Sequence, residues 1–127
     1  SDSAERIQID RERFVVVNNG EEITLPKKEM SDAIKMITTI SQEIKITLLP
    51  NVIIFNSLSN DNVEAKTELE LSTGLNEQFE INCNSKYLLD FIFQTDTESF
   101  EMKFNEPNLP FMVKEGNFMT IIMPIVL

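Results

Sequence analysis

The sequence predicts one α+β domain in which a β-α-β-β-β unit occurs twice, with two helices packed on one side of antiparallel sheets. Three observations support this prediction. Several short segments alternate apolar and polar residues, as strands do, and two segments have the apolar spacing of amphipathic helices. Residues 22–34 and 80–92 also resemble each other, which indicates an internal repeat.

The composition excludes most kinds of enzyme. The chain has 127 residues, a formal net charge of −10, one cysteine and no histidine. It therefore offers no catalytic triad and no zinc site, and it contains no glycine-rich phosphate loop. We expect no catalytic residue, no metal ion and no cofactor. The acidic charge argues against a broadly basic nucleic-acid-binding face, but it leaves room for one locally basic surface.

The same sequence predicts a cytoplasmic protein with no membrane association. A single cysteine excludes an internal disulfide and fits a reducing compartment. No segment approaches the roughly 18 consecutive apolar residues that a membrane-spanning helix needs. The first residues also lack the apolar centre of a signal peptide.

The first half of the chain predicts an arm followed by one β-α-β-β-β unit. We interpret residues 1–20 as an incoming arm, the end of a preceding domain or a remnant of cloning, with a short apolar stretch at 14–17. Pro26 suits the first turn of a helix, where its missing N–H costs nothing. The expected elements are strands at 21–25, 44–48, 52–55 and 63–71, a helix at 27–42 and a polar loop at 57–62.

The second half predicts the same order of elements. Asn84 is a plausible N-cap for a helix at 85–95, and Cys83 fits a small apolar side chain that faces the core. The expected strands lie at 79–83, 100–104, 111–114 and 118–122. Between the two copies, Glu22/Glu80, Ile23/Ile81, Lys28/Lys86, Asp32/Asp90 and Ile34/Ile92 are identical pairs. We place the repeat halves at about 21–73 and 77–127.

Two motifs in the second half resemble a known family. Residues 81–90 read INCNSKYLLD and the chain ends in MPIVL. Both are similar to the C-terminal, third domain of the bacterial DNA sliding clamp, the beta subunit of DNA polymerase III. The family's patterns are I-x-x-N-x-x-Y-L-L-D and a terminal M-P-x-R-L. The resemblance covers residues 21–127 and implies the DNA-clamp fold.

The resemblance implies a processivity factor of the replicative polymerase, without catalysis of its own. In that family three such domains form a protomer, and two protomers join head-to-tail in a ring around duplex DNA. Helices line the hole, so Lys28, Lys35 and Lys86 would face DNA and make weak contacts that are not sequence-specific. From periodicity alone, these lysines are ordinary solvated side chains.

The resemblance also implies a peptide-binding pocket at the end of the chain. There the family binds short linear motifs of DNA polymerase, the clamp loader and repair proteins, with the second domain supplying the other wall. The residues expected in the pocket are Asn108, Pro110, Ile121, Ile122, Met123, Pro124, Ile125, Val126 and Leu127. Val126 stands where the family commonly has arginine. The alternative is a closing strand with a frayed tail.

The resemblance finally implies where protomers meet. Ile40, Glu64 and Glu68 would approach the next protomer, although Lys66 interrupts an acidic strand at this joint. Two other classes of function remain open from the residues themselves. One is a free-standing acidic protein-interaction module without a DNA role. The other is an enzyme with carboxylate catalysis, for which the sequence offers no acid/base pair.

Overall fold

In the computed structural model the chain folds as the repeat predicts. The structure describes residues 20–58, 64–94 and 96–127. All but the last residue of the arm expected at 1–20 and most of the loop at 57–62 therefore lie outside the described residues. The first unit comprises β1 (Glu21–Pro26), α2 (Lys27–Thr38), β2 (Glu43–Leu48), β3 (Val52–Ser57) and β4 (Lys66–Glu70). The second comprises β5 (Phe79–Asn84), α3 (Ser85–Ile92), β6 (Ser99–Phe104), β7 (Phe111–Glu115) and β8 (Phe118–Ile122). The doubled β-α-β-β-β order is confirmed.

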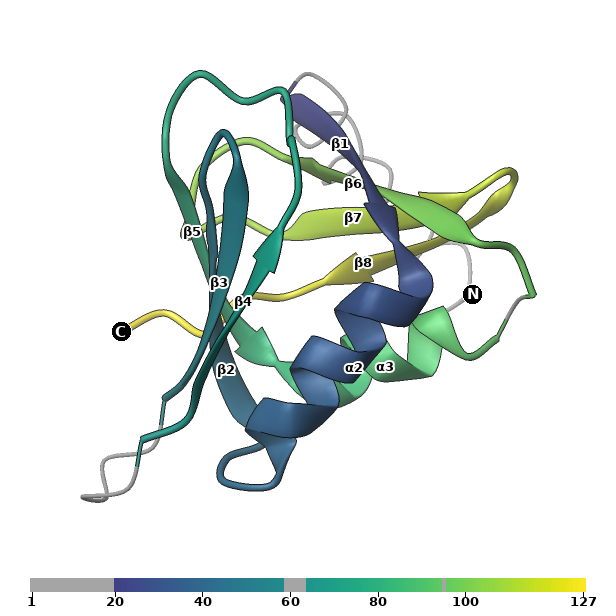
Figure 1. Ribbon diagram of the computed structural model, residues 1–127. Helices are drawn as coiled ribbons and strands as arrows, with labels where there is room; N and C mark the ends of the chain where they lie inside the picture. The colour runs from purple at the N-terminus through teal and green to yellow at the C-terminus, as the bar shows by residue number, and fades with distance from the viewer. Residues whose placement is uncertain (1–19, 59–63, 95) are drawn as a thin grey trace, which may run out of the picture.

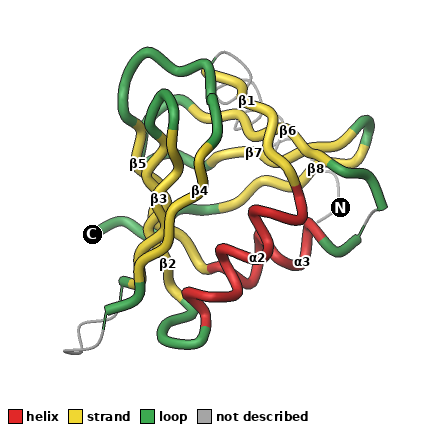
Figure 2. The backbone as a smooth tube through the Cα atoms, in the orientation of Figure 1, coloured by secondary structure: helices red, strands yellow, loops and turns green. Residues whose placement is uncertain are grey.

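The strands form two antiparallel sheets, and the two helices lie together on one side of them (Figures 1 and 2). One sheet has the order β1-β6-β7-β8, and the other has the order β4-β3-β2-β5. Each sheet therefore takes strands from both halves of the repeat, because β1 pairs with β6 and β2 pairs with β5. Strands β1, β4, β5 and β8 are outer strands, and each has an edge that no described strand covers.

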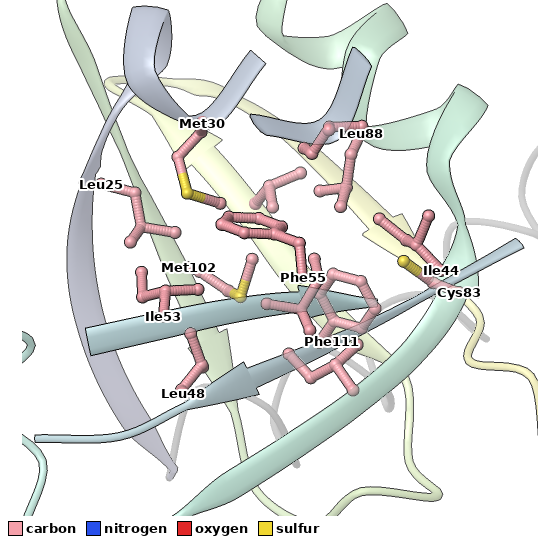
Figure 3. Close-up of a cluster of buried hydrophobic side chains, with 14 of the residues drawn as sticks. Leu25, Met30, Ile44, Leu48, Ile53, Phe55, Cys83, Leu88, Met102 and Phe111 are labelled. Atoms are coloured by element: carbon pink, nitrogen blue, oxygen red, sulfur yellow. The ribbon is translucent and has the colours of Figure 1, made fainter. Parts of the chain in front are cut away.

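Alternation along the strands builds the core between the sheets and helices. Ile44, Ile46 and Leu48 of β2 are fully buried, whereas Glu43 is exposed and Lys45 is partly exposed. The other strands contribute inward residues in the same way, and Met30 and Leu88 add contacts from the helices (Figure 3). Cys83 is buried in this cluster, as expected. No described helix combines the length and hydropathy required to cross a membrane.

Helix α2 ends four residues before the predicted boundary at 42. The hydroxyls of Thr38 and Thr39 donate hydrogen bonds to the carbonyls of Lys35 and Met36. The N–H groups of residues 40 and 41 both donate to the Ile37 carbonyl. Consecutive β-branched residues have lower helix propensity, and their hydroxyls compete for backbone partners, so the helix closes here. Helix α3 likewise ends at residue 92 rather than 95, and β4 begins at residue 66 rather than 63.

Both helices begin where the sequence predicted, but they are capped differently. The side-chain oxygen of Asn84 accepts a hydrogen bond from the Lys86 N–H at 2.9 Å, which confirms the expected N-cap of α3. Pro26 is the N-cap of α2, and its ring offers no side-chain cap bond. The Lys27 N–H instead donates to the Glu98 carbonyl at 2.9 Å, which ties the start of α2 to the segment before β6.

Candidate functional site

The β7–β8 hairpin determines where the C-terminal tail, Met123–Leu127, leaves the sheet. Gly116 takes a φ of 56° in the turn, a backbone conformation that glycine adopts without steric cost. Phe111 is the register partner of Ile122. Pro110 and Met123 are therefore the next residues at the same end of the hairpin, and Asn108 lies two residues further into the β6–β7 loop. The structure thus brings the two loop residues of the predicted pocket to the base of the tail.

A backbone hydrogen bond joins the tail to the other sheet. The Ile125 N–H donates to the Asn82 carbonyl at 2.7 Å. Asn82 belongs to β5, the outer strand next to β2, so the tail lies along the edge of β5 that faces away from β2. Figure 1 shows the tail leaving β8 and passing this sheet before the C-terminus. The tail therefore connects β8, the outer strand of one sheet, to the free edge of β5 in the other sheet.

The side chains of the tail are apolar, and three of the five are exposed. Met123, Val126 and Leu127 expose 53%, 63% and 83% of their surface, whereas Ile122 exposes 2% and belongs to the core. Pro124 and Ile125 are half-buried, as is Ile121. Ile122 thus fixes the start of the tail, and the residues beyond it can contact another molecule. A run of exposed apolar side chains is typical of an interaction site.

The three predicted DNA-facing lysines lie on the exposed surface of the helices. Lys28 and Lys35 are exposed on α2, and Lys86 is exposed on α3. The Lys35 ammonium lies 4.6 Å from the centre of the Phe93 ring, which links the two helices by a cation–π contact. Acidic side chains are exposed on the same two helices, namely Glu29, Asp32 and Asp90. The exposed surface of the two helices is therefore of mixed charge.

The residues expected at a joint between protomers lie near the outer strand β4. Glu68 is exposed on β4, with 54% of its side-chain surface accessible, and Glu64 is exposed just before it. Ile40 follows α2, which packs against β4, and exposes 42% of its surface. Met36 is also exposed, one helical turn before Ile40. Met36 was not among the residues expected at this joint, although its spacing from Ile40 could have indicated it.

The described residues hold no cluster of metal ligands, and their cysteine is buried. Residues 20–58, 64–94 and 96–127 contain no group of His, Cys, Asp or Glu arranged to hold a metal ion. Burial raises the pKa of the Cys83 thiol from 9.0 to about 12, so the thiol stays protonated at neutral pH. A protonated, buried thiol is a poor nucleophile.

Comparisons with known proteins define the class as a sliding-clamp domain. A Helicobacter pylori beta clamp bound to a DNA ligase peptide superposes with a TM-score of 0.76 and 32% identity, over 84% of this chain and 29% of that one. The polymerase III beta protein from Caulobacter crescentus matches at 0.77 and 26% identity, over 86% and 30%. A Bartonella birtlesii clamp bound to griselimycin shares the fold at a TM-score of 0.80 and 21% identity, over 93% and 34%.

The chain belongs to the family formed by the C-terminal domain of the DNA polymerase III beta subunit, whose family model matches residues 13–126. The beta sliding clamp of Helicobacter pylori strain J99 is 34% identical over 117 residues, which cover 82% of this chain and 31% of the relative. The chain therefore spans about a third of the length of that curated relative.

Proposed function

We propose that this chain is the third domain of a processivity clamp and that its C-terminal tail forms one wall of a peptide-binding pocket. The observation that carries the proposal is the tail itself, which presents exposed apolar side chains from a position bonded to the edge of β5. Flexible methionine and branched aliphatic side chains can adapt to the apolar anchors of different peptides.

The proposed wall comprises the tail with its neighbours in the hairpin and loop. Met123, Val126 and Leu127 supply exposed contact surface, while Pro124 and Ile125 are half-buried beside them. Ile121, Pro110 and Asn108 complete the proposed set at the base of the tail. Ile122, which was expected in the pocket, is buried in the core and anchors the tail instead. A Helicobacter pylori relative that is 32% identical binds a DNA ligase peptide, which supports this role.

The partners follow from the family. We propose that the polymerase, the clamp loader and repair proteins insert short linear motifs at the tail, and that residues beyond this chain supply the opposite wall.

Within the chain, the clamp domain spans residues 21–127, with halves at about 21–73 and 77–127. Val126 removes the cation that the family commonly places there, so the polar selectivity of the pocket differs from that of relatives with arginine.

We further propose that the exposed surface of α2 and α3 faces duplex DNA in a closed ring. A ring retains DNA by encircling it, so its inner surface does not require high affinity. Three lysines among comparable numbers of acidic side chains suit weak, salt-sensitive contacts. The ring would close as a head-to-tail homodimer at Ile40, Glu64 and Glu68, and it would act in the cytoplasm without catalysis or cofactor.

Peptide binding to the full-length protein with and without residues 123–127 tests the proposal. Loss of binding on deletion supports it, and unchanged affinity contradicts it.

A further inference from the structure

Asn82 has a buried side-chain oxygen with no hydrogen-bond partner among the described residues. Its backbone carbonyl accepts the 2.7 Å hydrogen bond from the Ile125 N–H, so this oxygen belongs to the residue on which the tail rests. The oxygen atom itself has less than 1 Å² of solvent-accessible surface. An unsatisfied buried amide oxygen costs about 1–3 kcal/mol, and folded proteins seldom retain one. A donor supplied by a bound molecule would remove this cost.

The position of Asn82 in the sheet indicates where that donor enters. Ile81 and Cys83 face the core, so the Asn82 side chain points to the outer face of the sheet. Its register partner on β2 is Lys45, whose ammonium lies 3.9 Å from the Glu80 carboxylate. On the opposite side of β5 lies the tail. The side-chain oxygen therefore sits on the strand that borders the tail.

We propose that the Asn82 side-chain oxygen accepts a hydrogen bond from an amide N–H of the peptide that binds along the tail. This inference rests on the proposed function and makes Asn82 a specificity-determining residue of the same pocket. The tail has no polar side chain between Met123 and Leu127, so polar contacts to a peptide must come from neighbouring elements. An extended peptide carries N–H groups that need acceptors when they are buried.

The hydrogen bond forms when the bound peptide brings an amide N–H to the oxygen. The free state thus holds an unsatisfied acceptor, and the bound state pairs it. The unsatisfied oxygen raises the free energy of the unbound protein. Pairing it in the complex therefore adds affinity that an apolar wall alone does not provide. Asn82 selects peptides that place an amide N–H at this point and rejects peptides that lack one there.

The test uses the full-length protein, the Asn82→Leu variant and a fluorescein-labelled Gln-Leu-Ser-Leu-Phe peptide, with affinity measured by fluorescence anisotropy. Leucine keeps the branched shape of asparagine and removes the acceptor. We expect Asn82→Leu to have a higher melting temperature than the wild type and to bind the peptide about tenfold more weakly. A residue with a purely structural role does not raise stability and lower affinity together.

Asn56→Leu is the matched control. Asn56 faces the same outer side of the sheet and pairs with Lys45 from the opposite neighbour, β3. Its substitution is expected to leave the affinity unchanged. A second series removes single N–H groups from the peptide, by N-methylation of each backbone amide or by replacing its glutamine with methionine. One such peptide should bind the wild type about tenfold more weakly but bind Asn82→Leu no differently from the parent peptide.

Three outcomes overturn the inference. They are unchanged affinity in Asn82→Leu, lower stability in that variant, or equal losses for every modified peptide in both proteins. Deletion of residues 123–127 is measured in parallel. If the deletion abolishes binding while Asn82→Leu has no effect, the inference fails and the proposed function stands. If the deletion has no effect, the proposed function fails.

Discussion

The ammonium group of Lys27 lies 2.8 Å from the carboxylate of Glu115, and their side chains expose only 7% and 11% of their surface. This ion pair joins the first residue of α2 to the last residue of β7, across the two halves of the repeat. The β7–β8 turn follows directly, so the pair also fixes the hairpin that leads to the tail. A buried pair of this kind is costly to break because the remaining charge stays desolvated.

Replacing Lys27 with alanine is therefore expected to lower the free energy of unfolding by about 3 kcal/mol. Urea denaturation followed by circular dichroism measures the change. Lys66→Ala is the control, because the Lys66–Glu68 pair is 3.6 Å apart and exposed. That variant should change stability by less than about 1 kcal/mol. Equal losses of unfolding free energy in the two variants would show that the buried pair stabilises the fold no more than the exposed pair does.

The Cys83 thiol is expected to resist modification in the folded protein. Burial raises its pKa from 9.0 to about 12, so at pH 8 it is both protonated and inaccessible. Reaction with a chromogenic disulfide reagent should be negligible in buffer and complete in guanidinium chloride. Rapid reaction in buffer contradicts the burial of Cys83.

The same pKa shift predicts how stability depends on pH. The unfolded thiol deprotonates above its ordinary pKa of 9.0, whereas the folded thiol holds its proton up to about 12. Deprotonation therefore stabilises the unfolded state as pH rises from 9 to 12, and the free energy of unfolding falls there, on the order of 1 kcal/mol per pH unit. Cys83→Ala should lack this component, so the stability difference between the two proteins should vary above pH 9 and be constant below it.

Charge reversal on the helices is expected to weaken DNA retention. Replacing Lys28, Lys35 and Lys86 with glutamate makes the proposed inner surface strongly acidic and repels phosphates. The dwell time of the loaded full-length ring on circular DNA should fall several-fold at low salt, while peptide affinity stays unchanged. A control reverses Lys45 and Lys114 on the sheets. If this control lowers the dwell time equally, the helices are not the DNA-facing surface.

Protomer association is expected to depend on the surface beside β4. Ile40→Arg replaces the apolar member of the proposed joint with a charged side chain and should shift the full-length protein toward monomer in analytical ultracentrifugation. Phe93→Arg alters another exposed apolar side chain, at the end of α3, and should leave the assembly intact. A dimer that survives Ile40→Arg places the joint elsewhere.

Much of the fold could be predicted because the spacing of apolar residues within short segments indicates each strand and helix. The alternation in β2 and the spacing of Met30, Ile34 and Ile37 reflect one-sided burial, which a sequence displays directly. The repeat then indicated the element order. The helix ends were less predictable, because Thr38 and Thr39 act through hydroxyl bonds to nearby carbonyls that compete with continued helix.

The candidate site could be predicted only in part. An interaction role for the tail could be predicted because an apolar run with an internal proline is unusual at the end of a strand. Ile122 looked like its neighbours in sequence, yet the structure buries it in the core. Asn82 looked like an ordinary outward-facing strand residue. Its importance follows from the tail crossing β5 at that residue, a long-range contact that local patterns do not contain.

Binding of the fluorescein-labelled Gln-Leu-Ser-Leu-Phe peptide to the full-length protein, with and without residues 123–127, is the decisive test of the proposed peptide-binding wall. The deletion begins just after Ile122, the last core residue, so the melting temperature should fall only slightly. We expect the affinity to fall by at least about a hundredfold, because the exposed apolar wall is lost. Unchanged affinity in a folded deletion variant would show that the tail is not the peptide-binding wall.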